Sequence, residues 1–179
     1  DYLYITSKNI GHGTLDVAGA ERIDAGQHRV IYRRCDVRTG DLLITKDGAS
    51  TGNAALNDLE EEFSLLSSAA FLRFDTRRHA PGYYLQQVLS SDGQKRIKQM
   101  MAGNAITRLT LEKIRELQFP VPALPEQCAI ATALSDVDAL ISSLDKLIAK
   151  KRDIKQAAMQ QLLTGRRRLP GFSDVWGVG

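Results

Sequence analysis

The chain has 179 residues, of which 43% are hydrophobic and 25% are charged. This balance is typical of a globular protein with a hydrophobic core and argues against disorder as its main state. Lysine and arginine total 24, and aspartate and glutamate total 21, which gives a net charge of +3. So small an excess permits a nucleic-acid partner without indicating one, because local clustering of charge matters more than the sum. No apolar run approaches the roughly 20 residues that a membrane-spanning helix needs.

The cysteines and histidines form no metal-binding pattern. Cys35 and Cys128 make no CxxC pair, and His12, His28 and His79 are scattered along the chain. We therefore expect no metal and no cofactor. We interpret the cysteines as reduced thiols of a cytoplasmic protein, with a single disulfide as the alternative. The first residues also lack the basic and apolar segments of a secretory signal.

Up to residue 122, short apolar runs alternate with turn signals. This pattern predicts strands over residues 28–33, 42–45, 53–56 and 64–74, because Gly, Asp, Asn or charged residues separate the runs. Strands this short indicate a mixed or antiparallel sheet. Helices are expected over 81–89, opened by Pro81, and over 94–101 and 111–116. A loop at 102–104 and an extended segment at 119–122 complete the domain, whose fold class is α/β with an α+β-like mixed sheet.

From residue 123 the pattern becomes one long helix. Pro125 suits the first turn, no glycine or proline follows as far as Thr164, and Gly165 supplies the stop. We expect a globular domain at 1–122, a long helix at 123–165 and a basic tail at 166–179. The helix would be longer than the preceding domain is wide, so we expect it to protrude.

An apolar seam along this helix predicts a coiled coil. Six residues follow the 4-3 spacing of such a seam, and two more continue it after a change of phase: Ile130, Leu134, Val137, Ile141, Leu144 and Ile148, then Ile154 and Leu162. Burying each of these side chains stabilises by about 1.5–3 kcal/mol, so an uncovered seam would be costly. We expect a second long helix, from another copy or repeat, to cover it. The alternative is a helix that packs on its own domain.

Charge is ordered along the same helix. The acidic residues Glu126, Asp136, Asp138 and Asp145 precede the first lysine, Lys146. Basic residues then dominate from Lys146 to Arg168, with Asp153 as the exception. This order suits the helix dipole. It also suits an antiparallel partner of similar sequence, although a solvated charged face would show the same residues.

No catalytic signature is present in the sequence. The loop 48–52 lacks the Gly-Lys-Ser/Thr ending of a phosphate-binding P-loop, and the sequence contains no GxGxxG, HExxH or GxSxG. We therefore predict a binding or scaffolding module rather than an enzyme. An enzyme with a dispersed active site stays open as an alternative, which a pocket of converging titratable groups would revive.

Residues 1–122 contain 16 basic and 15 acidic residues, so a DNA-binding face must come from segregation of charge. The densest basic clusters are Arg77-Arg78 and Lys95-Arg96-x-Lys98. Polar groups on the loop 46–53 could read base edges in the major groove. The candidate DNA-binding residues are Lys46, Ser50, Thr51, Asn53, Arg77, Arg78, Lys95, Arg96, Lys98, Asn104 and Arg108. The alternative is that these basic clusters are ordinary solvated surface charges without a DNA contact.

Several motifs together resemble one known family. Leu117-Gln-Phe-Pro-Val-Pro-Ala-Leu-Pro-Glu-Gln127 leads into the long helix, which ends in Met159-Gln-Gln-Leu-Leu-Thr-Gly165. Both are similar to the conserved region of type I restriction-modification specificity subunits (HsdS). Gly40-Asp-Leu-Leu-Ile-Thr45, with Gly48 and Gly52 after it, is similar to the central hairpin of their target recognition domains. The resemblance runs from about residue 2 to residue 172.

The resemblance implies a protein that recognises DNA and catalyses nothing itself, with residues 1–122 as a DNA target recognition domain and residues 123–165 as a spacer or dimerisation helix. In this family two recognition domains each read half of a split site, and two long helices pair antiparallel between them. Methyltransferase subunits dock on the assembly and supply S-adenosylmethionine chemistry, and motor subunits supply translocation and cleavage. The expected partners are thus double-stranded DNA, these subunits, and a second copy or repeat, without a membrane. A coiled-coil adaptor whose globular part binds protein is the alternative function.

The chain departs from the family pattern at both ends. It does not begin with methionine, and the segment that usually opens a recognition domain is missing before Asp1. After the helix, residues 170–179 look like the start of another recognition domain. We expect either a half-subunit that pairs with a second copy or a piece of a two-repeat protein.

Overall fold

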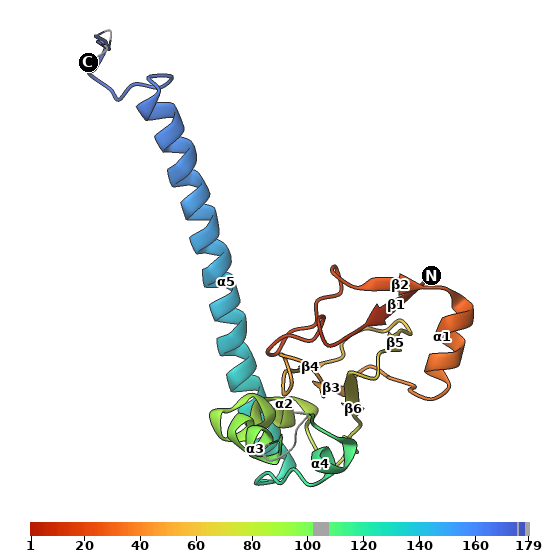
Figure 1. The fold of residues 1–179 in the computed structure, drawn as a ribbon. Coiled ribbons are helices and arrows are strands. Elements are labelled where there is room, and N and C mark those ends of the chain that lie inside the picture. Colours follow the sequence, from red (N-terminus) through yellow and green to blue (C-terminus); the bar gives the residue numbers. More distant parts are fainter. Residues whose placement is uncertain (102–107, 175, 178–179) are drawn as a thin grey trace. The chain divides into compact units, whose positions relative to one another are not determined.

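The computed structural model describes residues 1–101, 108–174 and 176–177. The chain divides into two compact units, Asp1–Ala133 and Leu134–Gly179, which are described separately. The first contains two small sheets with the helices α1 to α4 (Figure 1). The helix α5, Leu124–Leu163, begins in the first unit and forms most of the second.

One sheet of the first unit contains three strands in the order β2-β1-β5, which are Glu21–Ile23, Tyr2–Ile5 and Ser64–Leu65. β1 pairs antiparallel with β2 and parallel with β5. The helix α1, Ala25–Tyr32, contacts β5. This mixed pairing agrees with the mixed sheet expected from the sequence.

The second sheet is antiparallel in the order β4-β3-β6, which are Ala54–Leu56, Leu42–Thr45 and Ala69–Leu72. All four residues of β3 are buried, because the strand is covered on both faces. Leu42 and Ile44 face one core with the helices, and Leu43 between them faces a second core. The sheet thus lies between the two cores of the unit.

Three helices cover the first core: α2, Pro81–Leu89; α3, Ser91–Met101; and α4, Leu111–Arg115. Ile97 of α3 and Ile114 of α4 pack into this core with Val88 of α2. Pro81 stands in the first turn of α2 and Thr110 caps α4, accepting a hydrogen bond from the Lys113 N–H. The three helices and the strands at 42–45 and 53–56 confirm the sequence predictions within one to three residues.

Two strand predictions were wrong. Residues 28–33 fall in α1, because Asp24 caps a helix here and accepts hydrogen bonds from the Gly26 and Gln27 N–H groups. The single strand expected over 64–74 is two short strands in different sheets, separated by a turn in which the Ala69 N–H donates to the Leu66 carbonyl. The loop expected at 102–104 lies outside the described residues.

The long helix agrees closely with its prediction. It contains 40 residues, and Gly165 follows with φ of 71°, a left-handed conformation that only glycine adopts at little cost. At about 1.5 Å per residue the helix is about 60 Å long. The fold class, a mixed α/β domain followed by a long helix, is confirmed.

Candidate nucleic-acid interface

The loop between β3 and β4, residues 46–53, is a compact hairpin connection. The Thr45 N–H donates to the Asn53 carbonyl at 2.8 Å, and the Gly52 N–H donates back to the Thr45 carbonyl at 3.0 Å. Gly52 has a φ of 94° and packs against Ile97, so a side chain there would be both strained and crowded. The loop is therefore ordered by its own backbone and not only by the strands that it joins.

Three neighbouring segments also hold this loop. The N–H groups of Lys46 and Asp47 donate to the Ser68 carbonyl at 2.8 and 3.2 Å. The Leu109 N–H donates to the Lys46 carbonyl at 3.0 Å. From α3, the side-chain amide of Gln94 donates to the Gly52 carbonyl at 2.9 Å. These hydrogen bonds bring together the loop 46–53, residues 108–109 and the side of α3 that carries Gln94.

Basic side chains gather at this place from separate parts of the sequence. Lys95 and Lys98 are exposed on α3, and Lys98 lies one turn after Gln94 on the same side of the helix, because residues three and four apart are neighbours on a helix surface. Lys95, three residues before Lys98, has its ammonium group 3.7 Å from the Asp92 carboxylate. Arg108 pairs with Asp47 of the loop, with Nε and Oδ1 2.7 Å apart. We call the loop 46–53 with Lys95, Lys98 and Arg108 the loop face.

The polar loop residues differ in how much of their hydrogen-bonding capacity is already used. The Thr51 hydroxyl donates to the Gly48 carbonyl at 2.7 Å, and the Asn53 amide donates to the Ile10 carbonyl at 3.2 Å. Both side chains are half-buried, as are those of Lys46 and Ser50. Thr51 and Asn53 therefore support the shape of the loop in this structure.

The remaining candidates lie elsewhere or are not described. Arg96 is about 200° around α3 from Gln94, and its guanidinium donates to the Gln118 carbonyl. Arg77 and Arg78 follow β6 beyond the Leu42–Leu72 pair, whereas the loop 46–53 follows the Thr45–Ala69 pair. The register of the sheet thus places these two arginines at the opposite end from the loop face. Asn104 lies outside the described residues.

Sequence reasoning gave no specific role to Asp41 and Arg73, which anchor the base of the central hairpin. The Arg73 Nε and Nη2 groups donate to the two carboxylate oxygens of Asp41 at 2.9 and 2.8 Å, and Asp41 is fully buried. The hydrogen bond to Asp41, with Asp36 beside it, raises the pKa of the Arg73 guanidinium above its usual value. The Gly40-Asp41 turn was the available signal, but its partner Arg73 is 32 residues away in the chain.

Gln127 connects the start of α5 to the first unit. Its side chain is buried, accepts a hydrogen bond from the Ala80 N–H at 2.9 Å and donates to the Pro122 carbonyl at 2.8 Å. Nearby, Ile130 and Ala131 pack against the first core. The glutamine of the Pro-Glu-Gln motif thus fixes the point at which the helix leaves the domain.

A serine, a histidine and a glutamate come together in α1 and β5. His28 Nδ1 is 3.0 Å from the Ser64 hydroxyl, and His28 Nε2 is 3.5 Å from Glu62. His28 also stacks on Tyr2 with ring centroids 3.7 Å apart, beside an open cavity of about 320 Å³. Ser64 is completely buried, so its hydroxyl cannot reach a substrate. We interpret the group as an anchor of α1 on the sheet rather than as a catalytic triad.

Across residues 1–101, 108–174 and 176–177, no cluster of His, Cys, Asp and Glu side chains has the arrangement of a metal site. In the same ranges, no helix is both long and apolar enough to cross a membrane.

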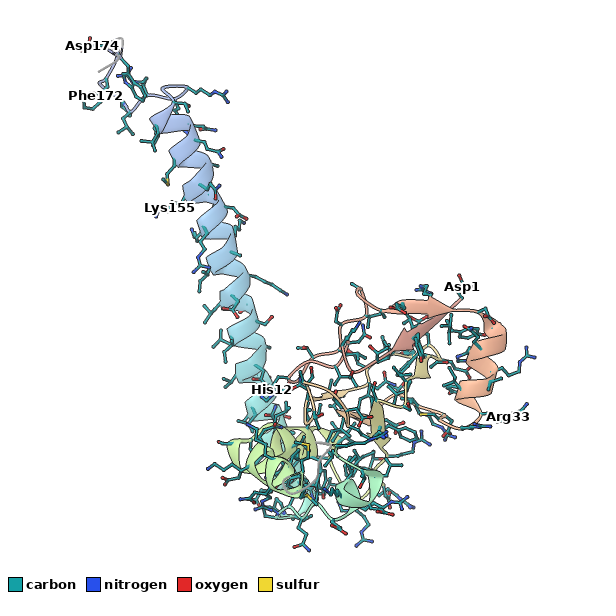
Figure 2. All side chains as sticks on the ribbon, viewed as in Figure 1. Asp1, His12, Arg33, Lys155, Phe172 and Asp174 are labelled. Atoms are coloured by element: carbon teal, nitrogen blue, oxygen red, sulfur yellow. The ribbon has the colours of Figure 1, made fainter. Side chains whose placement is uncertain are left out.

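The apolar seam of α5 stays largely exposed from Leu134 onward. Leu134, Val137, Ile141, Leu144, Ile148 and Ile154 are each between 43 and 53% exposed. Side chains stand out on all sides of the helix, among them Lys155 (Figure 2). Within the described part of the second unit, α5 is the only helix, so the unit itself offers no second helix for the seam.

The two ends of the predicted seam behave differently from its middle. Ile130 packs against the first core, so it belongs to the domain and not to an exposed seam. Leu162 is half-buried beside the tail, where the Arg168 guanidinium lies 5.1 Å from the Trp176 ring centre. The free part of the seam is therefore Leu134 to Ile154.

Comparison with known proteins places this fold in one family. Residues 5–152 match the family model described as the type I restriction modification DNA specificity domain. The chain is 30% identical over 129 residues to the protein named as the type I restriction enzyme MjaX specificity subunit of Methanocaldococcus jannaschii. It is 27% identical over 136 residues to the MjaVIII specificity subunit of the same organism. These matches cover 70% and 76% of this chain but only 30% and 31% of the two relatives.

Solved structures show the same fold. The HsdS subunit from Thermoanaerobacter tengcongensis superposes with a TM-score of 0.65 at 19% identity. A chain from a study of the assembly and conformational transition of the type I R-M system gives 0.66 at 18% identity. Each match covers 97% of this chain and 45% of the other, so the chain spans less than half the length of these proteins.

Proposed function

Because the chain belongs to the family of type I restriction modification DNA specificity domains, we propose that its first unit reads one half of a bipartite DNA site. The observation that carries the proposal is the loop face. There the loop 46–53, Lys95, Lys98 and Arg108 come together although they are far apart in the sequence. A protein with a net charge of only +3 can hold DNA if its cations are gathered in this way.

The loop face offers both kinds of contact that sequence recognition needs. Lys95 and Lys98 are exposed ammonium groups on a helix and are suited to phosphates, which fix the register of a protein on the duplex. The loop 46–53 is short and ordered, and can present its polar groups to base edges in the major groove. Arg77 and Arg78, at the other end of the sheet, are left out of this proposed face.

The second part of the proposal concerns α5. A second helix of the same kind, from another copy or from another repeat, covers the seam from Leu134 to Ile154 in an antiparallel pair. Supporting this orientation, Asp136, Asp138 and Asp145 precede the basic run that begins at Lys146. An antiparallel partner brings its basic half against this acidic half. The paired helices then set the distance between two DNA-reading units.

In this role the chain is a specificity component and supplies no catalytic group. Methyltransferase subunits dock on it and carry out the S-adenosylmethionine chemistry, and motor and nuclease subunits complete the restriction complex. Both curated relatives are named as specificity subunits of type I restriction enzymes, which supports this assignment. The DNA sequence recognised defines where those subunits act.

DNA binding by the protein, assembled with its methyltransferase subunits, tests the loop face. A gel-shift titration over salt measures the number of phosphate contacts, because the affinity of a DNA reader falls steeply as salt rises. Replacing Lys95 and Lys98 together with alanine should lower the slope of log affinity against log salt by about two. Arg96→Ala, on the other flank of the same helix, is the matched control and should leave the slope unchanged.

Two results would reject this proposal. If the wild-type assembly binds no DNA, or binds it without salt dependence, the adaptor function becomes the better account. If Arg96→Ala changes the slope and the lysine pair does not, the DNA face lies on the opposite flank of α3.

A further inference from the structure

The ion pair between Arg108 and Asp47 has a geometry that points to base recognition. The two groups come from different segments, with Nε and Oδ1 2.7 Å apart, and their side chains are 52% and 30% exposed. Surface ion pairs of this kind contribute little to stability. The pair therefore has little effect on folding, and its main consequence is the orientation of the guanidinium.

Both partners are fixed through their backbones. The Asp47 N–H donates to the Ser68 carbonyl at 3.2 Å, in the turn that joins the two sheets. Leu109, directly after Arg108, is completely buried and donates its N–H to the Lys46 carbonyl. Arg108 thus stands beside a buried anchor, and Asp47 lies on a loop that is held at several points. A guanidinium supported in this way loses little conformational entropy when it makes a further contact.

The Arg108 side chain is 52% exposed beside Asp47, so its guanidinium, with five N–H donors, can reach a second acceptor. Two acceptor groups match a guanidinium, the O6 and N7 atoms of guanine and the oxygens of a phosphate. The carboxylate of Asp47 decides between them. It repels a phosphate, which carries a full negative charge, more strongly than the neutral edge of a base, and it offsets the charge of the arginine. A guanine is therefore the favoured partner.

We propose that Arg108 recognises a guanine in the major groove and that Asp47 is the positioning residue that holds its guanidinium for this contact. This inference rests on the proposed DNA-reading function and adds to it the identity of one base. The recognised half-site then contains a guanine whose identity depends on Arg108. Asp47 contributes through Arg108, without itself touching DNA.

The test uses the intact restriction-modification complex in two stages. Sequencing the modified bases of cells that carry it first gives the bipartite motif. Duplexes are then made in which each guanine of the half-site is replaced, one at a time, by 7-deazaguanine, which lacks the N7 acceptor but pairs normally. The wild-type complex should bind one of these duplexes about twofold to tenfold more weakly, since the replacement removes one of the two hydrogen bonds of a bidentate contact worth about 1–3 kcal/mol.

The variants should remove this discrimination selectively. The quantity compared is the affinity for the unmodified duplex divided by the affinity for the 7-deazaguanine duplex that the wild-type complex binds more weakly. In Arg108→Ala this ratio should fall to about one, and in Asp47→Ala it should fall part of the way. Asp75→Ala and Arg77→Ala are matched controls, because Arg77 and Asp75 also form an exposed arginine–aspartate pair, with Nε and Oδ1 3.0 Å apart, at the other end of the sheet. Both controls should keep the wild-type ratio. The ratio is informative even if a variant binds more weakly to every duplex.

The outcomes separate this inference from the function on which it rests. A wild-type complex that modifies no bipartite motif contradicts the DNA-reading function itself. A bipartite motif whose guanines can all be replaced by 7-deazaguanine without loss of affinity overturns the role of Arg108 alone. An Arg108→Ala variant that keeps the wild-type ratio also overturns the role of Arg108, because Arg108 would then contact only the phosphates of the DNA or only stabilise the fold.

Discussion

In the unit Asp1–Ala133, large apolar side chains such as Leu42, Ile44 and Ile97 are completely buried between sheets and helices. In the unit Leu134–Gly179, Val137, Ile141 and Leu144 are about half exposed along one helix. The same residue types thus make a closed core in one unit and an open stripe in the other. This contrast indicates that the first unit is stabilised by its own packing, and the open stripe is the observation on which the proposed helix pairing rests.

The largest expected difference between the units comes from removing a phenyl ring in each. Phe63 is 1% exposed and Phe172 is 66% exposed. Phe63→Ala should reduce the free energy of unfolding of the first unit by about 3–5 kcal/mol, because it leaves a cavity. Phe172→Ala should change it by less than about 0.5 kcal/mol. Urea unfolding curves of both variants measure this, and equal losses would mean that the tail is part of the core.

A charge placed in the open stripe should act on association and not on folding. Ile141→Asp buries a carboxylate in the proposed helix pair and removes apolar contact, so pairing should weaken by about a hundredfold. Ala139→Asp, on the opposite face of the helix, introduces the same residue and should leave pairing intact. Sedimentation velocity over a range of concentrations distinguishes the two. A strictly monomeric wild-type chain at micromolar concentration would contradict pairing between copies.

Gln127, in the first turns of α5 and within the first unit, should show an intermediate effect. Gln127→Ala leaves the Ala80 N–H and the Pro122 carbonyl without their partner in a buried place, which should cost about 1–3 kcal/mol. The exposed Gln99 on α3 is a matched control, and its change to alanine should have little effect. Thermal unfolding of the two variants tests this. Similar melting temperatures would show that the glutamine does not anchor the helix.

The smallest effect concerns acid stability at the far end of the sheet. Hydrogen bonds from the Arg77 side chain, and then from its backbone N–H, lower the pKa of Asp75 below its usual value of 3.8. A carboxylate with a lowered pKa stabilises the folded state above about pH 4, and this contribution is lost as the pH falls through the folded-state value. Arg77→Ala should therefore raise the pKa of Asp75 in an NMR titration, with a small effect because the group is exposed. An unchanged pKa would contradict the pairing.

Several features could be read from the sequence because their signals are local. The helix from Leu124 to Leu163 was predicted almost to its ends, since a long apolar period, Pro125 and Gly165 act within a few residues of one another. The strand Leu42–Thr45 and its turn were predicted for the same reason. The run at 28–33 predicts a strand, whereas the structure forms the helix α1 there, with Asp24 as its N-cap.

The composition of the candidate site depended on contacts between distant segments. The sequence named Lys46, Arg77, Arg96 and Arg108 alike as DNA contacts, since clusters of charge carry no information on where strands pair. Only the register of β3 with β6 separates Arg77 from the loop 46–53. Only the tertiary structure brings Arg108 Nε within 2.7 Å of Asp47 Oδ1.

By itself the sequence determined the helix, its apolar stripe and the family resemblance, because these are periodic or contiguous patterns along the chain. The tertiary structure decided which basic side chains lie together and which end of the apolar seam packs against the first core. It also showed that Ser64 and His28 contact each other and that Asp41 binds Arg73, contacts that hold the fold together. The physical reason is that burial, sheet register and hydrogen bonds such as those of Gln94 and Gln127 join residues by position in space.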